Sequence, residues 1–75
     1  MWQEENNILS REFSFPDFKS ALEFVVQVGA LAESANHHPD VELGWGRVKI
    51  SLTTHDARKV TKKDRDLSQQ IDELK

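Results

Sequence analysis

A chain of 75 residues without cysteine forms one domain at most and excludes disulfide cross-links and thiolate chemistry. Its formal net charge of −3, with both signs mixed along the chain, argues against direct nucleic-acid binding. No apolar run is long enough to span a membrane, and the first segment, MWQEENN, lacks the apolar core of a signal peptide. We therefore expect a cytoplasmic protein without a membrane partner. Because so short a chain buries only a thin core, we also expect it to oligomerise.

The first segment of the chain predicts a β-hairpin. Residues 2–5 and 8–15 flank Asn6-Asn7, a pair that tolerates left-handed turn geometry. Three apolar side chains of the second arm recur at period two and share one face: Leu9, Phe13 and Phe15.

Residues 16–36 predict a long helix, since Pro16 suits its first turn and Asp17 its positive end. Its apolar residues follow two stripes, one through Phe18, Leu22, Val25, Gly29 and Ala32 and the other through Ala21, Phe24, Val28, Leu31 and Ala35. Two stripes indicate burial on two sides. We expect one side to pack on a sheet and part of the other to contact a second subunit. A wide stripe on a monomeric core is the alternative.

The exit of this helix carries two adjacent histidines. Pro39 removes a backbone donor and pushes His38 out of helical geometry, so the helix must end near Asn36. We expect the rings of His37 and His38 to point in different directions. Glu33 stands four residues before His37, the spacing of one helix face.

The remaining residues predict a second hairpin and a second helix. Strands within residues 41–54 flank a turn bracketed by Gly44 and Gly46, and residues 61–75 form an amphipathic helix. Thr61, with Asp64 three positions later, resembles a capping box. The order ββαββα predicts an α+β fold, an antiparallel sheet with helices on one face. We expect this sheet to continue across a dimer interface.

All three histidines, including His55 after the last strand, lie at the ends of predicted elements, near several aspartates: Asp40, Asp56 and Asp64. Imidazoles with carboxylates that fix their tautomers are typical of a proton-transfer site, and three imidazoles also suit zinc. The alternatives without a functional role are that the histidines lie in surface loops, that Asp64 is an ordinary helix-start residue, and that Trp45 only packs in a turn. The residues alone leave these interpretations open.

The spacing of these residues resembles that of the pterin-4a-carbinolamine dehydratase family. The matching pattern covers almost the whole chain and comprises Trp2, Glu33, His37-His38-Pro39, Trp45, Thr54-His55, and Thr61 with Asp64. The entry to the first helix, FSFPDF, is also similar to that of the family.

This resemblance implies loss of water from a 4a-hydroxytetrahydropterin to give a quinonoid dihydropterin, without metal or cofactor. His37 and His55 would be the acid/base pair, and His38 would position the pterin and assist as a proton donor. Other side chains would hold the substrate or support the histidines: Glu33, Asn36, Pro39, Trp45, Thr53, Thr54, Asp56 and Asp64. Pro39 and Trp45 would form apolar walls of the pocket. A homodimer or homotetramer is also implied.

The sequence departs from the family pattern at three places. Members usually carry a helix before the first tryptophan, so we expect a short form lacking it. Arg58-Lys59 stand where members tend to have glycine, and Ser34 replaces a common lysine. The alternative function is therefore a catalytically weak or inactive protein-binding scaffold, like relatives that act as assembly factors or transcription-factor dimerisation cofactors.

Overall fold

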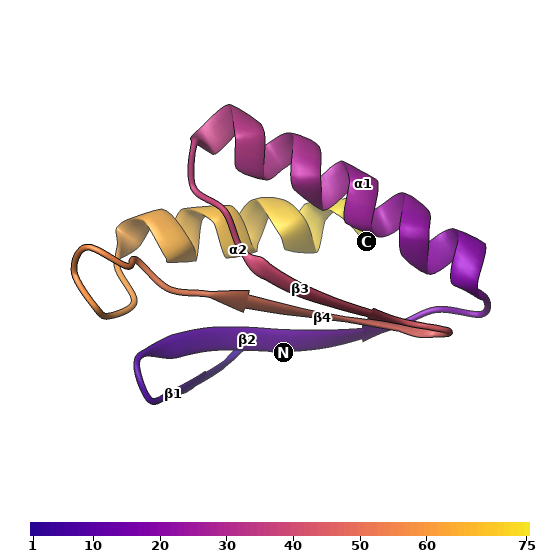
Figure 1. Ribbon diagram of the computed structural model, residues 1–75, viewed down its shortest axis with the longest axis horizontal. Helices are drawn as coiled ribbons and strands as arrows, with labels where there is room; N and C mark the ends of the chain where they lie inside the picture. The colour runs from indigo at the N-terminus through magenta and orange to yellow at the C-terminus, as the bar shows by residue number, and fades with distance from the viewer.

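The computed structural model describes residues 1–75 and contains four strands and two helices in the order ββαββα (Figure 1). The elements are β1 (Gln3–Glu5), β2 (Ile8–Ser14), α1 (Phe18–Ala35), β3 (Asp40–Gly44), β4 (Arg47–Leu52) and α2 (Lys62–Leu74). The predicted order and the α+β class are confirmed. Neither helix combines the length and the hydropathy needed to cross a bilayer.

The four strands form one antiparallel sheet in the order β1-β2-β4-β3. Both helices cover the same face, and the other face is left without a helix (Figure 1). Ten buried side chains form the core between the layers: Leu9, Phe13, Ala21, Phe24, Val28, Val48, Ile50, Leu52, Leu67 and Ile71. The predicted arrangement of helices on one face of an antiparallel sheet is therefore confirmed.

The first hairpin turns at the predicted residues. Asn6 and Asn7 have φ values of 53° and 64°, and Glu5 pairs with Ile8 on either side of them. Left-handed geometry at both central positions gives the turn a twist that matches the twist of its strands. Asparagine adopts this geometry at lower cost than most other residues.

Arg11 lies between two buried apolar residues on the helix-facing side of β2 without disrupting the core. Its guanidinium donates to Asp72 Oδ1 at 2.9 Å and stacks over the Phe13 ring, 4.5 Å from the ring centroid. The Trp2 indole N–H donates to the same Asp72 oxygen at 2.9 Å. These contacts attach β1 and β2 to the C-terminal part of α2.

Helix α1 begins at Asp17, whose carboxylate accepts a hydrogen bond from the Ser20 backbone N–H at 2.8 Å. The helix buries one side only, through Ala21, Phe24, Val28 and Ala32. The two predicted stripes are therefore not buried to the same extent. Phe18 and Leu22 of the first stripe are exposed and, with the exposed Val26, form a line at four-residue spacing on the outer surface of α1. We call Phe18, Leu22 and Val26 the outer stripe.

The second hairpin turns at Trp45-Gly46, since Gly44 is the last residue of β3 and pairs with Arg47. No glycine in the chain has a positive φ, so backbone flexibility does not explain Gly46. A Cβ at Gly46 would lie 3.0 Å from the Phe15 carbonyl oxygen, while the Phe15 N–H donates to the Gly46 carbonyl at 2.8 Å. Glycine is favoured at position 46 because a Cβ there would force the Phe15 carbonyl to shift by a few tenths of an ångström.

We predict opposite effects of two glycine-to-alanine substitutions on the free energy of unfolding. Gly46→Ala should lower it by about 1 kcal/mol or more, because a backbone carbonyl must shift. Gly29→Ala, in the middle of α1 with nothing within 4 Å of its added Cβ, should raise it by about 0.5–1 kcal/mol through helix propensity. Urea unfolding of both variants and the parent measures the difference, and a stabilising Gly46→Ala would contradict the close-approach explanation.

Candidate active site

The exit of α1 is formed by a left-handed asparagine. Asn36 has φ 52°, and its N–H donates to the Glu33 carbonyl at 3.2 Å while the His37 N–H donates to the Ala32 carbonyl at 3.1 Å. This pair of reversed hydrogen bonds is a Schellman motif. Helix α1 therefore ends before His37, which no longer follows the helical spacing that begins at Glu33.

The two histidines of this exit bond to different carboxylates. His37 Nε2 lies 2.5 Å from Asp64 Oδ1 at the start of α2, and His38 Nε2 bonds to the exposed Glu33 carboxylate. The expected divergence of the two rings is confirmed. The spacing argument that paired Glu33 with His37 is wrong, because the end of the helix turns His37 inward and leaves His38 beside Glu33.

Asp64 is fully buried and connects three segments of the chain. Its Oδ2 accepts from the Thr61 backbone N–H at 2.9 Å and from the Thr54 hydroxyl at 2.8 Å, while Oδ1 faces His37. The predicted capping box, with aspartate in place of glutamate, is confirmed. The same carboxylate that starts α2 also holds an imidazole of the candidate site, so its two roles coexist.

The environment of Asp64 keeps it ionised. Burial raises the pKa of the Asp64 carboxyl, but hydrogen bonds to both of its oxygens, first of all from His37, outweigh this effect and hold the pKa below its ordinary value. An ionised carboxylate only accepts hydrogen bonds, so His37 carries a proton on Nε2. Nδ1 is then the His37 ring nitrogen left to exchange a proton.

His55 lies in a short loop after β4. An isolated bridge between Thr54 and Lys59 closes this loop, and Arg58 within it adopts a left-handed φ of 57°. The antiparallel pairing of Asp40 with Ser51 brings the start of β3 beside the end of β4. The exit of α1 and the loop of His55 consequently lie at the same end of the molecule (Figure 1).

A pocket of about 500 Å³ opens at this end, and all three histidines line it. Seven of the side chains expected from the sequence contribute to its wall: Asn36, His37, His38, Pro39, Thr54, His55 and Asp56. Asp40 and Lys63 also line the pocket and were not among the expected binding residues. Lys63 directly precedes Asp64 in the sequence, and this adjacency to an expected site residue was the available signal that Lys63 lies at the pocket.

Four of the expected residues lie outside the wall of this pocket. Glu33 bonds to His38 and Asp64 bonds to His37, and neither carboxylate lines the pocket itself. The Thr53 hydroxyl donates instead to the Asn7 carbonyl at 2.8 Å. Trp45 sits in the β3–β4 turn with 72% of its surface exposed and does not line this pocket within the single chain.

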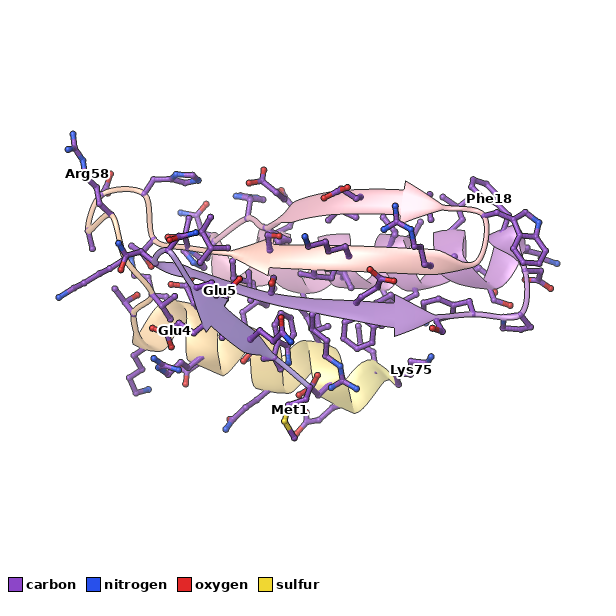
Figure 2. The ribbon with its side chains drawn as sticks, turned by 90° about the horizontal axis from the view of Figure 1, so that it is seen from below. Met1, Glu4, Glu5, Phe18, Arg58 and Lys75 are labelled. Atoms are coloured by element: carbon purple, nitrogen blue, oxygen red, sulfur yellow. The ribbon has the colours of Figure 1, made fainter.

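The position of Trp45 follows from the direction of β3. This strand runs away from Pro39 toward the end of the molecule that carries Phe18, opposite the loop that carries Arg58 (Figure 2). Period-two alternation located the strand correctly but could not place its far end relative to the histidines.

The chain contains no group of three or more His, Asp and Glu side chains arranged to hold a metal ion. Instead, His37 and His38 each bond to a separate carboxylate. The fold and the pocket thus define a small α+β protein with three imidazoles gathered at one end of its sheet, an arrangement suited to proton transfer.

Sequence comparison assigns this protein to a family. A family model described as Pterin 4 alpha carbinolamine dehydratase matches residues 1–74. A protein of Roseiflexus sp. (strain RS-1), provisionally named pterin-4-alpha-carbinolamine dehydratase, is 51% identical over 73 residues, which cover 97% of this chain and 78% of the relative. A protein of Sulfurisphaera tokodaii with the same provisional name is 44% identical over 73 residues, which cover 97% of this chain and 78% of that relative. The chain belongs to the pterin-4a-carbinolamine dehydratase family.

Solved structures agree with this assignment. A Brucella melitensis protein described as a transcriptional coactivator/pterin dehydratase superposes with a TM-score of 0.93 at 31% identity, covering 97% of this chain and 80% of the other. A pterin dehydratase-like protein described as a RuBisCO assembly factor in the alpha-carboxysome gives a TM-score of 0.80 at 23% identity, covering 99% and 86%. The second likeness shows a shared fold only.

We predict that Asp64 makes the folded chain less stable in acid. Its pKa lies below the ordinary value of 3.8, so between these two pKa values the unfolded chain binds more protons than the folded chain. The free energy of unfolding therefore decreases as the pH is lowered through this range. The contribution of Asp64 should be complete above about pH 5 and should be lost progressively below about pH 4.

Urea unfolding of the parent and Asp64→Asn at about pH 7, 5 and 3 tests this prediction. The variant should be less stable at neutral pH, because an amide cannot accept all three hydrogen bonds, and should have a flatter profile in acid. Parallel profiles for the two proteins would show that Asp64 does not carry the acid dependence.

Proposed function

We propose that this protein dehydrates a 4a-hydroxytetrahydropterin to a quinonoid dihydropterin by histidine acid/base catalysis, in the recycling of a tetrahydropterin such as tetrahydrobiopterin. The observation that carries the proposal is the convergence of His37, His38 and His55 on one pocket, with His37 held by the buried Asp64. Family membership supports the same reaction class, a hydro-lyase reaction.

The reaction removes one molecule of water and needs two proton transfers. A protonated imidazole gives its proton to the 4a-hydroxyl as the C4a–O bond breaks, and the hydroxyl leaves as water. A neutral imidazole takes the proton from N5, and the electron pair of the N5–H bond forms the C4a=N5 double bond. The two imidazoles exchange protonation states, which solvent then restores. Imidazoles do this at neutral pH without metal or cofactor.

The geometry supports different roles for the three histidines. His37 bonds to Asp64 through Nε2, which leaves Nδ1 for proton exchange, and His55 lines the same pocket from the loop after β4. These two form the proposed acid/base pair. His38, bonded to the exposed Glu33, orients the pterin and assists as a proton donor, and Pro39 offers the ring an apolar edge.

A second candidate function is a protein-binding scaffold of low or no activity. The outer stripe favours it, because Phe18, Leu22 and Val26 expose 45%, 42% and 65% of their surfaces, and a contiguous exposed apolar patch is typical of a protein-interaction surface. The structural relative described as a coactivator as well as a dehydratase also supports this second candidate. The loss or retention of activity in His55→Ala separates the two candidates.

The outer stripe also supports the expected homo-oligomer, a dimer or a tetramer. Self-association through α1 would remove these apolar side chains from water. The sheet has free edges at β1 and β3, and either edge could continue it across a two-fold axis.

We predict that His37→Ala and His55→Ala each lower the dehydration rate by about 10²-fold or more. His55→Ala should change the free energy of unfolding little, whereas His37→Ala should also lower it, because the buried Asp64 loses a hydrogen-bond partner. His38→Ala should raise KM at least as strongly as it lowers kcat, because its main role is to position the substrate. Stopped-flow measurement of 4a-carbinolamine loss, with urea unfolding as the control for folding, separates these effects. If His55→Ala dehydrates the substrate as fast as the parent, the enzyme proposal fails and the scaffold takes its place.

We predict a solution mass at least twice that of one 8.6 kDa chain. Val26→Asp should shift the protein toward monomer, because it places a charge at the most exposed position of the outer stripe. Gln69→Asp, which adds the same charge at an exposed position of α2, is the matched control and should keep the parental mass. Light scattering at micromolar concentration measures all three proteins, and a folded parental monomer would contradict the prediction.

A further inference from the structure

Thr54 makes contacts that the proposed acid/base roles do not explain. It lies two residues beyond the end of β4 and directly before His55. Its backbone N–H donates to the Lys59 carbonyl at 3.1 Å, and its carbonyl accepts from the Ala57 and Arg58 N–H groups at 3.1 and 2.8 Å. The backbone of Thr54 therefore closes the loop that carries His55.

The side chain of Thr54 reaches the other half of the site. Its hydroxyl lies 2.8 Å from Asp64 Oδ2 and 2.6 Å from the Thr61 hydroxyl. Because the ionised Asp64 only accepts, the single Thr54 proton goes to Asp64, and the Thr54 oxygen accepts from Thr61. The hydrogen bonds then run in one direction, from Thr61 to Thr54 to Asp64, with His37 donating to the other Asp64 oxygen.

We propose that Thr54 is a positioning residue that fixes the tautomer of His37 through Asp64. The rotation of a carboxylate about its last side-chain bond is only loosely restricted on its own. The Thr54 hydroxyl and the Thr61 N–H hold Oδ2 from two sides, so Oδ1 stays directed at His37 Nε2. The His37 proton remains on Nε2, and Nδ1 remains the nitrogen presented to the pterin.

This role deepens the proposed dehydration and rests on it for its catalytic consequence. It also couples the two halves of the acid/base pair, since one residue closes the loop of His55 and orients the partner of His37. A threonine that only contacted substrate would have no reason to donate its proton to a fully buried carboxylate.

The test compares Thr54→Val, which keeps the shape and loses the hydroxyl, with Thr54→Ser, which keeps the hydroxyl. The ring nitrogens of His37 are followed by long-range ¹H–¹⁵N NMR through a pH titration, and the tautomer is read at the neutral end point. The parent and Thr54→Ser should hold the neutral ring proton on Nε2. Thr54→Val should show a mixture of tautomers and a turnover lower by about 10–100-fold, by analogy with the cost of removing the hydrogen-bond partner that orients a metal-bound histidine.

Ser68→Ala is the matched control. It removes the buried Ser68 hydroxyl of α2, which donates to the Arg65 carbonyl at 2.7 Å and has no bond to Asp64. It should keep both the tautomer and the turnover of the parent even where it lowers stability. If Thr54→Val does not fold, Thr54→Ala serves in its place.

The outcomes separate this proposal from the proposed function. A parental His37 tautomer in the hydroxyl-free variant overturns the role of Thr54, whatever the activity. A mixed tautomer with parental turnover overturns it as well, because the positioning would have no catalytic effect. A mixed tautomer in a protein whose parent shows no dehydration supports the positioning and rejects the reaction instead.

Discussion

The buried carboxylate of Asp64 is the interaction on which the site and much of the fold depend. One oxygen faces His37 after α1, and the other accepts from Thr54 after β4 and from the first turn of α2. Three segments far apart in sequence therefore meet at one ionised group that is fully removed from water. A buried charge persists only where hydrogen bonds satisfy it, so losing any one of these partners disturbs the other two segments.

The antiparallel sheet divides the molecule into two ends with different tasks. At one end, the pairing of Asp40 with Ser51 brings the exit of α1 beside the exit of β4, and the polar pocket opens there. At the other end, the β3–β4 turn packs against the backbone that enters α1, where Gly46 leaves room for the Phe15 carbonyl. The outer stripe runs along α1 from this second end. Catalysis and self-association are thereby proposed on separate surfaces of a very small domain.

Local patterns predicted the elements well because their causes are local. The paired asparagines require a left-handed turn, and Thr61 with Asp64 forms a capping box regardless of what surrounds it. The contacts between elements were predicted less well. Glu33 was paired with His37 by helical spacing, but the Schellman end at Asn36 removes His37 from that register. Trp45 was expected in the pocket on family spacing alone, and the length and direction of β3 carry it to the opposite end.

The sequence by itself determined the order of the elements, the class of fold, the helix ends and the resemblance to a dehydratase family. Each of these follows from periodicity, turn chemistry and motif spacing, which depend on residues close in the chain. Only the tertiary structure decided that Asp64 holds His37, that Lys63 and Asp40 share the pocket wall, and which stripe of α1 is buried. These outcomes depend on strand register and on the direction in which each side chain leaves its element, and no short stretch of sequence contains that information.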